Sequence, residues 1–209
     1  MGEIVFQRNG QTEIRYFMNV AGLAYDTFVV HAISNKSSFL PPRLFYLWSV
    51  LRCLFQYTPQ AGELEFNQQK VSHKFYTINL GIGKYSGGGM QFVPHAEAAG
   101  DTMALTYVTA VSRLRVILNS YRFYEGKIAT FKEAFLTQTQ AINIEPAAGN
   151  ELLVEADGEF LGRCPASIRL IPQALVFIGA DTGRESKDLV KRICNDLISI
   201  NTVILKMDY

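Results

Sequence analysis

Short runs of apolar residues, each bounded by turn residues, fill positions 134 to 178 and constrain the fold more than any other feature of the sequence. We predict strands there at 134–145, 151–156, 160–164, 167–171 and 174–178. Short strands that follow one another at such regular spacing are typical of a β-sandwich or a β-barrel. The sequence therefore predicts a mainly β fold, which we expect to be a two-layer β-sandwich with helices at its periphery.

The N-terminal half of the chain extends this strand pattern. Asn9-Gly10 separates two strand-like segments, 3–7 and 12–19, and this dipeptide is typical of a hairpin with a primed turn. Further strands are predicted at 64–66, 71–80 and 103–108.

Helices are predicted between these strands, at 23–33, after Pro41-Pro42, and around 111–124. Proline is tolerated in the first turn of a helix, so the proline pair marks a helix start. Arg113, Arg115 and Arg122 in the third helix are expected to be solvated, or, in the alternative interpretation, to make peripheral contact with an anionic membrane. In the second helix, apolar residues repeat every three or four positions and are expected to pack in the core: Leu44, Leu47, Trp48, Leu51, Leu54 and Phe55.

The chain is expected to divide into a sandwich domain at 1–180 and a helical tail at 181–209. The tail contains a predicted helix at 186–198 with an apolar stripe along one side. Such a stripe needs a cover, so we expect it to dock on the sandwich or on a second copy of the chain, and a homodimer is predicted.

Charge and cysteine content exclude several classes of protein. The net charge is only +1, from 20 basic and 19 acidic residues, so nucleic acid is not expected as a partner. The three cysteines form no Cys-x-x-Cys pair, which argues against a metal site and favours free thiols in a reducing cytoplasm. We find no signal peptide and no apolar run long enough to span a membrane, so a cytoplasmic protein is expected.

The glycine-rich segment 81–90 is the first candidate for chemistry. It does not fit a Walker A loop, because Ile78 and Tyr85 occupy the positions where that loop needs glycine and serine or threonine. It does not fit a dinucleotide fingerprint either, since Ser86 replaces the third glycine. The plain structural interpretation is a bulged connection between strands.

The second candidate is Asp157-Gly158-Glu159, between two predicted strands. Asp-Gly is a strong hairpin signal, so a simple turn is one interpretation. In the other, a tight turn at the end of a sheet holds two carboxylates on a rigid support. One of them accepts a proton from an attacking hydroxyl, and the other contacts the nucleotide.

The order of these motifs resembles the C-terminal domain of the diacylglycerol kinase and sphingosine kinase family of soluble lipid kinases. The resemblance covers residues 12–180. It is carried by the stretch 16–26, the helix at 46–54, Gly87-Gly88-Gly89-Met90, Pro94-His95-Ala96, Gly126, Asp157-Gly158-Glu159, Pro165 and Ile171-Pro172-Gln173-Ala174-Leu175.

The resemblance implies a fold, a reaction and a set of site residues. In this family an N-terminal α/β domain and a C-terminal β-sandwich form a cleft, where the γ-phosphoryl group of ATP passes to a lipid hydroxyl. Asp157 matches the general base, and Glu159 matches a nucleotide-side contact. Gly87, Gly88 and Gly89 match a glycine run that is expected to support the cleft. ATP and Mg²⁺ are implied for the complete enzyme, and a lipid with a free hydroxyl is implied as its acceptor.

The departures from the family pattern limit what this chain is expected to do alone. The Gly-Gly-Asp-Gly nucleotide motif of the first domain does not occur in it, so neither that domain nor a tightly bound cofactor is expected here. The segment 99–104 keeps only Asp101 where relatives use several carboxylates for a structural magnesium, so we expect no metal site. The alternatives are a non-catalytic lipid-binding or interaction module derived from that domain, and a hydrolase that uses Asp157 and Glu159.

Overall fold

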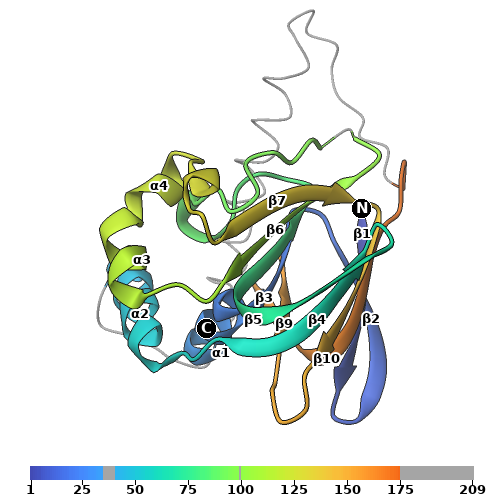
Figure 1. The fold of residues 1–209 in the computed structure, drawn as a ribbon, viewed down its shortest axis with the longest axis horizontal. Helices are drawn as coiled ribbons and strands as arrows, with labels where there is room; N and C mark the ends of the chain where they lie inside the picture. Colours follow the sequence, from blue (N-terminus) through green and yellow to red (C-terminus); the bar gives the residue numbers. More distant parts are fainter. Residues whose placement is uncertain (35–40, 99, 175–209) are drawn as a thin grey trace, which may run out of the picture. The chain divides into compact units, whose positions relative to one another are not determined.

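Antiparallel strands dominate the computed structural model, which describes residues 1–34, 41–98 and 100–174 (Figure 1). The described residues belong to one compact unit, Met1–Ala174. The strands of this unit are β1 (Gly2–Arg8), β2 (Gln11–Phe17), β3 (Val20–Ala24), β4 (Gln60–Phe66), β5 (Gln69–Gly81), β6 (Met103–Thr109), β7 (Ala134–Thr139), β8 (Ala141–Pro146), β9 (Leu153–Ala156) and β10 (Glu159–Leu170).

Strand pairing closes on itself through two long strands. The order β10-β8-β4-β5-β3-β9 returns to β10, while β1 and β2 extend from β10, and β6 and β7 extend from β5. β5 has 13 residues and β10 has 12, and each pairs with different partners along its two halves. Each has a register shift, between Phe75 and Thr77 in β5 and between Phe160 and Gly162 in β10. Bulges of this kind let a strand bend from one layer into another.

The two layers of the sandwich follow from this topology. One contains β2, β1, β10, β8 and β4, and the other contains β9, β3, β5, β6 and β7. β8 alternates buried and exposed residues, as a strand with one solvated face should. β3 is buried on both faces because helix α1 (Tyr25–Ile33) packs against it. The predicted two-layer β-sandwich with peripheral helices is confirmed.

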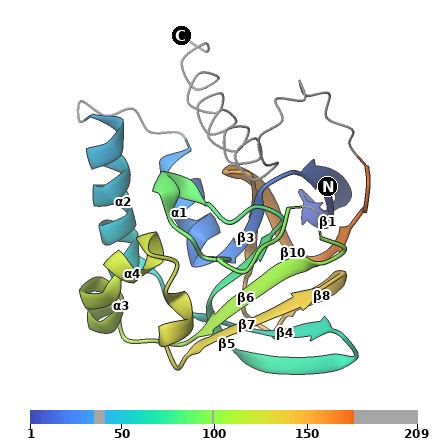
Figure 2. The same cartoon turned by 90° about the horizontal axis from the view of Figure 1, so that it is seen from above.

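Three further α-helices lie beside the sandwich: α2 (Pro42–Gln56), α3 (Arg113–Asn119) and α4 (Tyr121–Tyr124) (Figure 2). α2 begins at the proline pair as predicted and packs against α1. The expectation that its whole apolar stripe lies in the core is wrong. Leu54 is buried, but Trp48, Leu51 and Phe55 are 52%, 41% and 60% exposed. Among the described residues, α2 packs chiefly against α1.

Local turn chemistry predicted the hairpins better than the strand ends. Asn9 and Gly10 have φ values of 51° and 78°, which confirms the primed turn between β1 and β2. The predicted strand 134–145 is two strands, which separate at Gln140. The predicted strands 160–164 and 167–171 are one strand, β10, because Pro165 lies where the pairing with β1 shifts register and no ladder N–H is needed.

Several predictions fall on residues that the structure does not describe. These are part of the strand at 174–178, the helix at 186–198 and the tail at 181–209. The domain boundary at residue 180 stays a prediction for the same reason. Among the described residues, no helix combines the length and apolar character needed to cross a bilayer.

Candidate active site

The Asp157-Gly158 turn joins β9 to β10 at one end of the sheet. Asp157 has a φ of 50° and Gly158 a φ of 85°, so both residues adopt the left-handed backbone conformation that a two-residue primed turn requires. Aspartate tolerates this conformation better than most side chains, and glycine adopts it without a steric cost. The hairpin predicted from the Asp-Gly dipeptide is confirmed.

The Asp157 carboxylate binds the backbone of the turn between β2 and β3. Its Oδ2 accepts a hydrogen bond from the Met18 N–H at 2.8 Å. Its Oδ1 accepts from the N–H groups of Asn19 at 3.0 Å and Val20 at 3.1 Å. In addition, the Asp157 N–H donates to the Val20 carbonyl at 2.9 Å. The side chain is therefore held in one position on the sheet end, although the residue remains exposed to solvent.

The same turn contacts the glycine-rich segment that follows β5. The Asn19 carbonyl accepts from the N–H groups of Ile82 at 2.9 Å and Gly83 at 3.1 Å. The Asn19 side-chain amide donates to the Tyr85 carbonyl at 2.7 Å. A Cβ at Gly83 would lie 2.2 Å from the Asn19 Oδ1, so the close approach needs a glycine. The fold thus brings both predicted segments to one turn, through a residue, Asn19, that sequence reasoning did not single out as functional.

The glycine run itself is a short 3₁₀-helix within the connection between β5 and β6. It spans Gly87–Gly89, between Ser86 and Met90, which form an isolated antiparallel bridge. Gly89 has a φ of 86°, which favours glycine at that position. The Gly89 N–H donates to the Ser86 carbonyl at 3.0 Å. Support of the cleft by Gly87, Gly88 and Gly89 stays a prediction.

Glu159 opens β10 on the far side of the turn. Its side chain is 64% exposed and forms an ion pair with Arg15 of β2, with 3.3 Å between Oε1 and the guanidinium nitrogen. Arg15 is also half exposed, at 49%. Exposed ion pairs of this kind contribute only about 0–1 kcal/mol, so a ligand can displace the arginine at little cost.

A buried carboxyl lies directly beneath the turn. Glu155 of β9 is 7% exposed, and its Oε2 accepts from the Gly158 N–H at 2.9 Å. A Cβ on Gly22 would lie 2.4 Å from the Glu155 Oε1, so the opposite strand leaves space for this side chain. Burial, and to a lesser extent the neighbouring charges of Asp26 and Asp157, raises the pKa of Glu155 to about 8. Sequence reasoning missed Glu155, although a carboxylate within the apolar run 152–156 was a signal.

Asp26, at the start of α1, completes this acidic interior. Its Oδ2 accepts a hydrogen bond from the Thr77 hydroxyl at 2.5 Å. The Asn79 side-chain amide donates to the same hydroxyl at 3.0 Å. Burial raises the pKa of Asp26 above its ordinary value. Polar side chains of β5 thus support a second carboxyl near the hairpin that carries Asp157.

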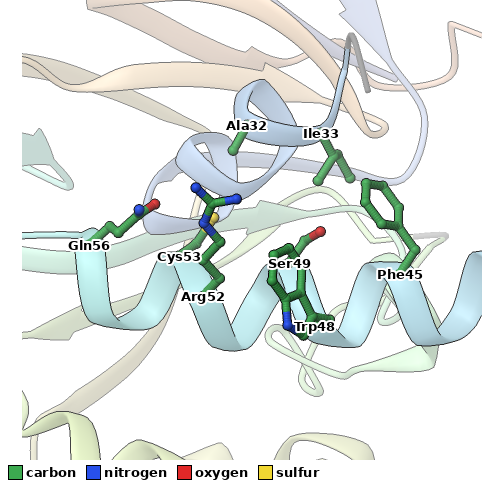
Figure 3. A pocket seen from close by; sticks show the side chains of 8 residues that line it. All are labelled: Ala32, Ile33, Phe45, Trp48, Ser49, Arg52, Cys53 and Gln56. Atoms are coloured by element: carbon green, nitrogen blue, oxygen red, sulfur yellow. The ribbon is translucent and has the colours of Figure 1, made fainter. Parts of the chain in front are cut away.

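The Asp157 hairpin lines neither of two hollows in the described surface. One is a groove of about 30 Å³ between α1 and α2, where Ala32 and Ile33 face Phe45, Trp48 and Arg52 (Figure 3). The other, of about 250 Å³, is lined by Asp101, Gln140, Leu170 and Pro172.

Metal-ligating side chains do not gather near Asp157. Within residues 1–34, 41–98 and 100–174, no three His, Cys, Asp or Glu side chains are grouped as a metal site. Asp157 is bonded to backbone N–H groups and Glu159 to an arginine. The described residues therefore do not fit a magnesium site of their own.

Comparison with known proteins gives one family match. A family model described as the YegS C-terminal NAD kinase beta sandwich-like domain matches residues 20–179. Two curated relatives from Mycobacterium tuberculosis, from strains CDC 1551/Oshkosh and ATCC 25618/H37Rv, are named diacylglycerol kinase. Both are 23% identical over 162 residues, which are 77% of this chain and 51% of the relative. The chain thus spans about half the length of the curated relatives that it matches.

Solved structures agree on the fold. A protein of Bacillus anthracis str. Sterne, provisionally named diacylglycerol kinase, superposes with a TM-score of 0.54 at 20% identity. The match covers 82% of this chain and 54% of that one. A second structure with the same provisional name and source gives a TM-score of 0.50 at 18% identity, over 82% of this chain and 55% of the other. At such identity these matches support the fold alone.

Proposed function

The chain belongs to the YegS C-terminal NAD kinase beta sandwich-like family, which confirms the predicted resemblance, and from this premise we propose that it is the lipid-side domain of an ATP-dependent lipid kinase. The acceptor would be a lipid with a free hydroxyl, diacylglycerol being the one that the relatives' names suggest. The observation that carries the proposal is the Asp157 carboxylate, which three backbone N–H groups hold at an exposed hairpin tip.

Asp157 is proposed as the general base. As the lipid oxygen attacks the γ-phosphorus, the bond from that phosphorus to the leaving ADP oxygen breaks. The lipid hydroxyl proton passes to the Asp157 carboxylate. Phosphoryl transfer depends mainly on position and charge, so a carboxylate that cannot swing away favours the reaction.

Glu159 is proposed as the nucleotide-side contact, and Glu155 as the residue that positions the turn. Glu159 is exposed, and its partner Arg15 is weakly held, so its carboxylate can bind a ribose hydroxyl. The Glu155 carboxyl accepts from the Gly158 N–H and therefore fixes the strand end from which Asp157 projects.

An α/β nucleotide-binding domain is the proposed partner, on the same polypeptide or a separate one. ATP supplies the phosphoryl group when bound between the two domains. The magnesium ligands would come from outside the residues described here, since these do not form such a set. We therefore expect little kinase activity from the sandwich alone. A cytoplasmic location is proposed because the three cysteines of the chain form no Cys-x-x-Cys pair, as is expected of free thiols in a reducing compartment.

The test combines this chain with the α/β domain of a relative and measures lipid phosphorylation from labelled ATP. Asp157→Asn is expected to lower the rate by about 100-fold or more, because general base catalysis contributes that much. Asp101→Asn is the matched control, since Asp101 is an exposed aspartate that lines a different hollow. Thermal unfolding of both variants shows whether the turn survives. Full activity of a folded Asp157→Asn protein would refute the base assignment.

A non-catalytic lipid-binding module is the second candidate. It is favoured by the segment 100–104, which keeps only Asp101, and by the structural hydrogen bonds that already engage Asp157. Lipid binding that needs no ATP, with no phosphorylation after the α/β domain is added, would select this candidate instead.

A further inference from the structure

Large apolar side chains are exposed in two stripes on the peripheral helices. On α2, Trp48, Leu51 and Phe55 recur at intervals of three and four residues. On α3 and α4 the stripe is Leu114, Leu118 and Tyr121, of which the two leucines are 66% and 65% exposed. Isolated exposed apolar residues are normal, whereas a grouped set marks an interaction surface. We call these six residues the helical face.

The fold brings together the helices that carry the two stripes, although they are far apart in the sequence. Figures 1 and 2 both show α2, α3 and α4 beside one another at the same end of the sandwich. The Arg113 guanidinium, at the start of α3, donates to the Tyr57 carbonyl at the end of α2 at 3.2 Å. Ser120 alone separates α3 from α4. The helical face is thus built from adjacent elements.

The helices that carry the helical face contain basic residues and no acidic ones. Segments 42–56 and 113–124 contain five arginines and no Asp or Glu, although the net charge of the chain is only +1. Arg52 lies 5.4 Å from the centre of the Trp48 ring, and Arg122 lies 5.7 Å from that of Tyr121. Arg115 is paired with Glu133, but among the described residues no ion pair engages Arg52 or Arg122.

We infer that the helical face docks on the surface of an anionic lipid bilayer. Leucine and aromatic side chains insert at the level of the headgroups, while arginines bind lipid phosphates. A second copy of the chain fits this surface less well, because a symmetric contact would bring the same arginines opposite one another. A protein partner remains an outcome that the test can reveal. The inference extends the proposed function, since a lipid kinase domain must meet its acceptor at a membrane.

The single tryptophan of the chain, Trp48, reports directly on this surface. The complete 209-residue chain is mixed with vesicles of phosphatidylcholine alone or with added phosphatidylglycerol. We expect a blue shift of the Trp48 emission, and quenching by brominated lipids, with the anionic vesicles, both weakened by salt. Unchanged emission and no co-sedimentation with anionic vesicles would overturn the inference. Vesicle binding is measured without ATP. The membrane inference can therefore fail while the kinase proposal succeeds, and the kinase proposal can fail while the membrane inference succeeds.

Variants distinguish vesicle binding by the helical face from nonspecific adsorption of the protein. Leu114→Ser with Leu118→Ser is expected to weaken vesicle binding about tenfold. Arg52→Gln and Arg122→Gln are each expected to weaken it about fivefold. The matched controls are Ile14→Ser on β2, where Ile14 is 56% exposed, and Arg8→Gln in the first hairpin. These controls should change binding less than twofold. Equal losses of vesicle binding in the control variants would overturn the inference. A blue shift of the Trp48 emission that grows with protein concentration in the absence of vesicles would also overturn it, because it would assign the helical face to contact with a second copy of the chain.

Discussion

Neutralising the buried carboxyl beneath the Asp157-Gly158 turn should change how stability depends on pH. Glu155 has a pKa of about 8 in the folded protein, against 4.5 ordinarily, with burial as the largest cause. The folded state holds this proton more tightly than the unfolded chain. The contribution of Glu155 to the free energy of unfolding is therefore complete below pH 4.5 and is lost as the pH rises through 8. At about 1.4 kcal/mol per pH unit, the contribution of Glu155 falls by about 4 kcal/mol between pH 5 and pH 9.

Glu155→Gln removes this titration while keeping an oxygen that can accept from the Gly158 N–H. Urea unfolding at several values between pH 5 and pH 9 should therefore give a flatter profile for the variant than for the parent. A constant offset from imperfect amide hydrogen bonding would cancel in this comparison. Asp26, whose pKa is also raised by burial, should leave a residual fall in both proteins.

The control for this experiment is Glu151→Gln, which changes an exposed glutamate just before the same strand. Its profile should run parallel to that of the parent. If the Glu155→Gln profile also runs parallel, the carboxyl is ionised at neutral pH in the folded protein, and the reasoning from burial is wrong.

Two further substitutions test the contacts around the turn. Gly22→Ala would place a Cβ 2.4 Å from the Glu155 Oε1 and should lower the free energy of unfolding by about 1–3 kcal/mol. Urea titrations measure this loss. A loss below about 0.5 kcal/mol, which is typical of an ordinary surface substitution, would show that the Glu155 carboxyl moves aside. Asn19→Ala removes the hydrogen bond to the Tyr85 carbonyl and should cost about 1 kcal/mol. In the reconstituted kinase it should also slow phosphorylation, and an unchanged rate would mean that the 81–85 segment does not help to place Asp157.

Local chemistry was enough to predict two of the hairpin turns with left-handed residues, because a dipeptide such as Asn9-Gly10 or Asp157-Gly158 selects its own conformation; the third, Asn67-Gln68, was not predicted. The alternation of apolar and polar residues was likewise enough for a mainly β fold. Strand ends were harder, since Pro165 interrupts a strand only if its missing N–H is needed by a neighbour. The register of β1 against β10 decides that question, and no local pattern contains it.

The helical face and the acidic interior show what only the tertiary structure decided. Periodicity predicted one apolar side on α2, but whether Trp48 or Leu54 is covered depends on which helix packs against it. The raised pKa of Glu155 depends on burial first and then on the charge of Asp26, a residue more than a hundred positions away. A sequence determines its local conformations through short-range sterics and hydrogen bonding. Burial, and with it charge state and docking surface, is set by contacts between segments that only the folded chain brings together.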